Sequence, residues 1–153
     1  MHKSTVTVLL TVFFVGLALG SDFFVGKALD TDKKIILPPG AKAGGNYSQG
    51  ILTGGTLYIS GQDGADAEGK IPGDFDAEVK QSLDNIGAVL KAAGMTPTDV
   101  VSVQVYLTDK ARFKQMNAIY TDYFKDPRPT RTTVAVAALM GPGNIEITVT
   151  ARK

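Results

Sequence analysis

The spacing of apolar residues predicts a series of strands and helices from residue 35 to the end of the chain. A short apolar run at 35–37 is stopped by two prolines, and two β-prone runs within 44–62 flank the pair Gly54-Gly55. Adjacent glycines suit a tight turn that needs positive φ, so this second segment is predicted to be a hairpin.

Two segments show helical spacing, in which apolar residues recur at steps of three and four and form one stripe. In 74–94 an aspartate at position 74 or 76 suits the start and Gly94 the end, while 111–124 has Asp109 available as a cap. The two stripes consist of Val79, Leu83, Ile86 and Leu90, and of Phe113, Met116, Tyr120 and Phe124.

Strict alternation of apolar and polar residues predicts further strands, one at 99–109 and two within 128–149. The last two are predicted to pair through a Gly-Pro-Gly turn at 141–143. Strands and helices in this order indicate an α+β fold with a mixed sheet and both helices on one face.

Arg131 and Glu146 stand out in these last two strands, and we predict that both lie on the sheet face opposite the helices. Their neighbours there are mostly Thr and Ala. Solvated faces of antiparallel sheets usually carry more charge, so a second copy of the chain is expected to cover this one. With a tight turn, the two residues lie about 13 Å apart along the strands, so a site using both takes one from a neighbouring subunit.

Each of these two residues also has an ordinary interpretation. Arg131 fits an arginine that extends along the start of an edge strand with its charge in water. Glu146 fits a solvated surface carboxylate. From the pattern alone, both interpretations remain open.

The first residues have a different composition. Residues 1–20 have a basic start, an apolar run and small residues at Ala18 and Gly20, which is typical of a secretory signal peptide. An uncleaved membrane anchor is the alternative, since the uncharged run is near the lower limit for a span. Cleavage after Gly20 would leave a tether at 21–34, a domain at 35–153, and a periplasmic or secreted protein.

Composition excludes several kinds of chemistry. The chain has no cysteine and one histidine, His2, so after cleavage no thiolate nucleophile, no histidine base and no His/Cys metal site remains. We therefore expect no metal and no cofactor. Removal of Lys3 would leave 15 basic and 15 acidic residues, and this neutrality argues against nucleic acid as a partner.

A set of short stretches, in order and at matching spacing, resembles the Rid family (reactive intermediate deaminases, also called YjgF-like). The resemblance covers 35–153 and rests on NYSQG (46–50), LYISGQ (57–62), QSLDNIGAVLKAAG (81–94), DVVSVQVYLTD (99–109), FKQMNAIYTDYF (113–124), PTRTTV (129–134) and IEIT (145–148).

This resemblance implies a chorismate-mutase-like fold and a homotrimer whose three sheets form a central barrel, with sites in the clefts between subunits. The implied reaction is hydrolysis of 2-imino acids or their enamine tautomers to 2-keto acids and ammonia. Arg131 matches the arginine that binds the substrate carboxylate, and Glu146 the glutamate that positions water. The remaining positions of the cleft are matched by Tyr47, Ser60, Gly61 and Thr133, the last through backbone groups near the imine nitrogen.

The chain departs from the family pattern at Asn46, where many members have Pro, at Thr133, where many have Cys, and in the turn 139–143. A predicted export signal is the largest departure, because most members are cytosolic. Two other functions therefore stay open: a trimer that binds small carboxylates or client proteins without turnover, and a ribonuclease, which is an older label of the family.

Overall fold

The computed structural model describes residues 32–41 and 45–153. The expected signal peptide at 1–20, and most of the expected tether at 21–34, lie outside these residues. In the part of the chain that the structure describes, no helix is long and apolar enough to cross a membrane.

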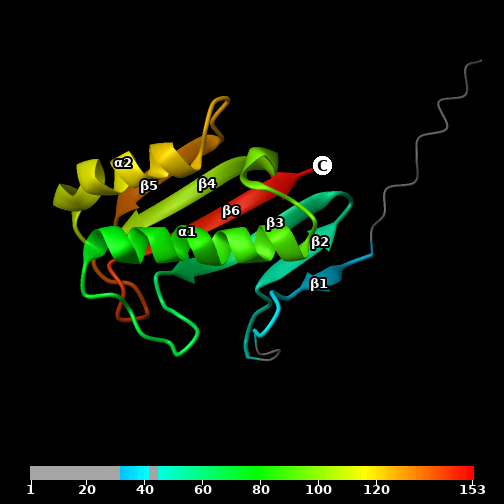
Figure 1. The fold of residues 1–153 in the computed structure, drawn as a ribbon, viewed down its shortest axis with the longest axis horizontal. Helices are drawn as coiled ribbons and strands as arrows, with labels where there is room; N and C mark the ends of the chain where they lie inside the picture. Colours follow the sequence, from blue (N-terminus) through cyan, green and yellow to red (C-terminus); the bar gives the residue numbers. More distant parts are fainter. Residues whose placement is uncertain (1–31, 42–44) are drawn as a thin grey trace, which may run out of the picture.

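A single six-stranded mixed sheet carries both helices on one face, as predicted (Figure 1). The strand order is β1-β2-β3-β6-β4-β5. The strands are β1 (Lys34–Ile36), β2 (Gly50–Thr53), β3 (Thr56–Asp63), β4 (Val100–Leu107), β5 (Thr130–Ala135) and β6 (Ile145–Arg152), and the helices are α1 (Phe75–Ala92) and α2 (Phe113–Tyr123). Among these strands of the described residues, only β4 and β5 pair in parallel.

Local signals place most of these elements where the sequence predicts them. Gly54 and Gly55 join β2 to β3 with φ of 54° and 76°, the positive values that a primed hairpin turn requires. The Asp74 carboxylate accepts a hydrogen bond from Ala77 N at 2.9 Å and caps α1. Asp109 instead caps the 3₁₀ turn Lys110–Arg112, which leads directly into α2.

The core lies between the helices and the inner face of the sheet. The apolar stripes of both helices are buried there except for Phe113, which is 40% exposed, and they pack with Ile145, Ile147 and Val149 of β6. One strand residue departs from the predicted alternation. Val101 is 48% exposed because the register shifts between Val100 and Ser102, which takes it out of the inward-facing series.

The predicted pairing of the last two strands is wrong. β6 runs between β3 and β4, antiparallel to both, and β5 lies beyond β4 at the edge of the sheet. The segment between β5 and β6 therefore crosses the end of β4 instead of making a tight hairpin. β4, which separates β5 from β6, buries Val103, Val105 and Leu107 under the helices.

The face of the sheet away from the helices carries few charges. Thr148, Thr150, Gln104 and Tyr106 are half-buried, and Val134 and Tyr58 are 41% and 53% exposed. Apolar surface of this kind is typical of an interaction face. The expectation that a second copy covers it stays a prediction.

Candidate active site

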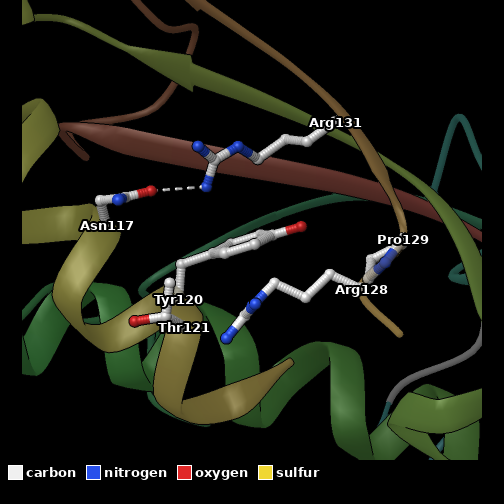
Figure 2. A pocket seen from close by; sticks show the side chains of 6 residues that line it. All are labelled: Asn117, Tyr120, Thr121, Arg128, Pro129 and Arg131. Atoms are coloured by element: carbon white, nitrogen blue, oxygen red, sulfur yellow. Dashed lines mark hydrogen bonds between the residues drawn. The ribbon is translucent and has the colours of Figure 1, made fainter. Parts of the chain in front are cut away.

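Arg131 lies at the start of the edge strand β5, with its guanidinium against α2. Its Nη1 donates a hydrogen bond to Asn117 Oδ1 at 2.8 Å, and its Cζ lies 4.3 Å from the centre of the Tyr120 ring. Figure 2 shows both contacts. An arginine held by one hydrogen bond and one aromatic face has its remaining N–H donors directed elsewhere, and these suit a carboxylate.

The prediction that Arg131 faces away from the helices is wrong. Its Cα pairs with that of Val103, which is fully buried under the helices, and parallel partners point to the same side of a sheet. Thr133 follows on the same side, and its buried hydroxyl has no hydrogen-bond partner among the described residues. The outer face instead receives Thr132 and Val134, both exposed.

Tyr120 is the largest buried group of this site, at 3% exposure. Burial raises the pKa of the Tyr120 phenol above its ordinary value, and the positive charges of Arg131 and Arg128 offset part of that rise. The phenol is therefore neutral at neutral pH and keeps a proton to donate. Its hydroxyl is buried and has no partner among the described residues.

Glu146 occupies the face that the sequence predicts, between the inward-pointing Ile145 and Ile147. Gly61 of β3 lies directly beside its carboxylate. A Cβ built on Gly61 would be 1.9 Å from Glu146 Oε1, so only glycine leaves room for the carboxylate there. The register shift between Ile59 and Gln62 places this glycine in an irregular part of the strand.

Ser60 precedes Gly61 in β3, and Tyr47 lies in the loop before β2. Ser60 Oγ donates to the Ser48 carbonyl at 2.7 Å, and Ser60 N donates to the Gln49 carbonyl at 3.0 Å. These bonds tie β3 to the loop that carries Tyr47, whose side chain is 66% exposed. The predicted site residues therefore form two groups, one around Glu146 and one around Arg131.

One chain does not bring these two groups together. Glu146 pairs with Tyr106, and Tyr106 pairs with Val134, three residues from Arg131. Two strand spacings of about 4.8 Å and three residues of about 3.3 Å put the two Cα atoms roughly 14 Å apart. The two side chains also lie on opposite faces of the sheet. The sequence-based expectation that Arg131 and Glu146 of one chain are too far apart to share a ligand therefore holds, although the hairpin from which it was argued does not form.

Replacing Gly61 with alanine is expected to lower activity while leaving the fold intact. The added methyl collides with the mobile end of Glu146, so the carboxylate rotates away and the backbone is spared. We expect at least a tenfold fall in kcat/KM for the reaction that the family resemblance implies, since a general base typically contributes roughly 100- to 10,000-fold and a displaced one keeps part of that. Thermal unfolding should change little.

The matched control is Gly73→Ala, since a Cβ on Gly73 meets no atom within 4 Å. Steady-state kinetics measures the activity of both variants, and a melting curve checks that both remain folded. Equal activity of the two variants would remove Glu146 from the site.

Sequence reasoning missed three residues that the structure places beside Arg131: Asn117, Tyr120 and Arg128. The sequence places Tyr120 in the buried stripe of the helix, which is correct for its ring, but the spacing carries no information on its hydroxyl. Asn117 follows the buried Met116 in the sequence. A polar residue at that position of the helix was the available signal that a polar partner lies on the sheet. Within residues 32–41 and 45–153, no three His, Cys, Asp or Glu side chains lie close enough together to hold a metal ion.

The fold and these two groups define a class: a small α+β domain with one mixed sheet, an arginine on its edge strand and a glutamate on the open face. Residues 39–153 match the family model described as Endoribonuclease L-PSP. The chain belongs to this family, which is the YjgF/Rid family.

Relatives with assigned names support the same membership. The chain is 46% identical to the 2-iminobutanoate/2-iminopropanoate deaminase of Bos taurus over 118 residues, which cover 75% of this chain and 86% of the relative. It is 46% identical to the human protein of the same name over 105 residues, 67% of this chain and 77% of the relative. A RutC family protein of Sulfurisphaera tokodaii is 42% identical over 111 residues, 71% of this chain and 89% of the relative.

Solved structures of similar proteins share the fold. RidA from the Antarctic bacterium Psychrobacter is 38% identical, with a TM-score of 0.74 over 78% of this chain and 99% of that one. A putative endoribonuclease from Thermotoga maritima is also 38% identical, with a TM-score of 0.75 over 80% of this chain and 98% of that one.

Proposed function

We propose that the protein hydrolyses reactive 2-imino acids, or their enamine tautomers, to 2-keto acids and ammonia. The observation that carries this proposal is the Arg131 guanidinium, held against Asn117 and Tyr120 beside an open pocket. The 46% identity to proteins named 2-iminobutanoate/2-iminopropanoate deaminase supports the choice of reaction.

Arg131 binds the substrate carboxylate through two parallel hydrogen bonds. A guanidinium stays charged at every relevant pH and matches a carboxylate in geometry. Asn117 and the Tyr120 ring fix its position before the substrate arrives, so less rotational freedom is lost on binding. The bound carboxylate in turn orients the adjacent imine carbon for attack.

Glu146 positions the attacking water and accepts one of its protons. The water oxygen adds to the imine carbon, the nitrogen takes up protons, and the carbon–nitrogen bond then breaks. Water and imine thus give one 2-keto acid and one ammonia, with no change of oxidation state and no co-reactant. The C=N bond is already electrophilic, so orientation and charge stabilisation suffice, and the lack of cysteine and of any histidine after His2 is no obstacle.

The site is proposed to form between subunits of a homotrimer, with Arg131 of one chain facing Glu146 of the next. Two observations support this. The two side chains of one protomer lie on opposite faces of the sheet, and Arg131 sits on the edge strand β5, where another subunit can approach. The open face with its exposed Val134 and Tyr58 supplies apolar area for the contact.

A coupled assay tests the function. An amino-acid oxidase generates 2-iminobutanoate, and semicarbazide traps whatever imine remains, with and without the purified protein. Deamination predicts faster loss of the trapped product and an equal gain of 2-ketobutyrate. If the protein binds 2-ketobutyrate in a calorimetric titration but leaves imine loss unchanged, it is a carboxylate-binding module and the proposed reaction is wrong.

Export is proposed on the layout of residues 1–20, a basic start, an apolar run and Ala18 and Gly20 before Ser21. The protein would then act in the periplasm or outside the cell, with small 2-imino and 2-keto acids as its partners. Mass spectrometry of the protein recovered outside the cytoplasm should give an N-terminus at Ser21. Recovery only in the cytoplasm, with Met1 retained, would contradict export.

A further inference from the structure

An open pocket of about 460 Å³ lies between α2 and the start of β5 (Figure 2). That volume is within the range of small-molecule sites. Its lining consists of Asn117, Tyr120, Thr121, Arg128, Pro129 and Arg131. Two of these residues are arginines and none is acidic, whereas a 2-imino acid with a neutral side chain needs only one cation.

The second arginine is available to a ligand. Arg128 Nη1 lies 2.5 Å from Asp126 Oδ1, and the two side chains are 42% and 78% exposed. An ion pair this open to water contributes little to stability, because water and salt compensate either charge. A ligand carboxylate can therefore take the place of Asp126 at small cost.

Tyr120 gives an independent indication that the pocket is built for a polar ligand. Its ring lies between the side chains of Arg131 and Arg128, and its hydroxyl is directed toward the segment that carries both (Figure 2). The residue is 97% buried, and the hydroxyl has no partner among the described residues. Buried hydroxyls nearly always have partners, so this one suits a bound acceptor.

We propose that this pocket binds compounds with two carboxylates, so that the preferred substrates are short 2-imino dicarboxylates, such as the imines of aspartate and glutamate. The claim that these compounds are substrates rests on the proposed deamination. The claim that the pocket binds dicarboxylates rests on the pocket alone. Arg131 binds the carboxylate next to the imine carbon, and Arg128 binds the distal one. The Tyr120 hydroxyl donates to an oxygen of one of these carboxylates.

Competition between two kinds of imine tests this selectivity. An aspartate or glutamate oxidase supplies the dicarboxylate imine, and an oxidase acting on 2-aminobutyrate supplies the monocarboxylate imine. We expect kcat/KM of the native protein to be at least tenfold higher for the dicarboxylate imine. Arg128→Gln should reduce that ratio by about tenfold, a typical loss for one charge-assisted hydrogen bond.

Lys125→Gln is the matched control. It removes one positive charge from the same region, and Lys125 does not line the pocket but pairs with Asp122 on the surface. The control should keep the native ratio, because selectivity arises from contact and not from net charge. An equal fall of the ratio in both variants, or a native ratio near one, would overturn the inference and leave deamination standing.

Binding of the stable products gives a readout that does not depend on catalysis. Calorimetric titration should show 2-ketoglutarate binding more tightly than 2-ketobutyrate, with the difference reduced by Arg128→Gln and unchanged by Lys125→Gln. If neither imine is hydrolysed, the proposed function fails, and this titration alone decides the ligand class. Equal affinity for the two keto acids would overturn the inference.

Discussion

Replacing Arg131 with alanine is expected to lower kcat/KM for imine hydrolysis by roughly 100- to 10,000-fold. The guanidinium is proposed to give the substrate carboxylate two charge-assisted hydrogen bonds, each contributing about 1.5 to 3 kcal/mol. Each 1.4 kcal/mol corresponds to about a tenfold change. The steady-state rate of 2-keto acid formation measures the loss.

Two further variants separate recognition from folding. Arg131→Lys keeps the charge but loses the planar pair of donors, so its activity should fall between native and alanine. Arg112→Ala removes another arginine that lies over an aromatic ring, 4.7 Å from the centre of Phe75, and should keep native kinetics. Native activity of Arg131→Ala in a folded protein would remove the residue from the mechanism.

Replacing Glu78 with alanine is expected to cause the largest loss of stability, about 3 to 5 kcal/mol. Glu78 lies on α1 and is 1% exposed. Its carboxylate accepts hydrogen bonds from Asn144 N, from Asn144 Nδ2 at 2.9 Å and from Ile145 N at 3.2 Å. Alanine leaves these donors unsatisfied around a cavity.

The consequence extends to the site because Ile145 begins β6, one residue before Glu146. A fall in melting temperature of roughly 10 to 20 °C is expected for a domain of this size. Glu78→Gln retains one acceptor oxygen and should cost less. Leu139→Ala, in the same connection but half-buried, is the control. Equal melting temperatures of native protein and Glu78→Ala would show that the buried carboxylate does not anchor this segment.

The local elements were predictable because their signals are local. Asp74, Gly54 and Gly55 have strong positional preferences, and the stripe from Val79 to Leu90 admits one buried face only. The strand pairing was not predictable in this way. A Gly-Pro-Gly sequence between two β-prone runs imitates a hairpin, whereas the observed order depends on contacts of β6 with β3 and β4, which are distant in the sequence.

The side of the sheet that Arg131 faces could not be read from its neighbours for a related reason. Thr occurs on both faces of β5, so a shift of one residue costs little in the hydrophobic pattern. In β6 the inward series Ile145, Ile147, Val149 fixes the register, and Glu146 was placed correctly. The roles of Asn117 and Glu78 were not predictable because their hydrogen-bond partners are distant in the sequence and meet them only in the folded chain.

The central claim, that Arg131 and Glu146 act together from different subunits, is tested most directly by mixing two inactive variants. Arg131→Ala and Glu146→Gln are each purified, then unfolded and refolded together, and mixed trimers are verified by mass spectrometry. In a random mixture, about one quarter of the sites take an intact arginine from one subunit and an intact glutamate from its neighbour, so about one quarter of native activity should return. Verified mixed trimers that remain inactive would contradict the account.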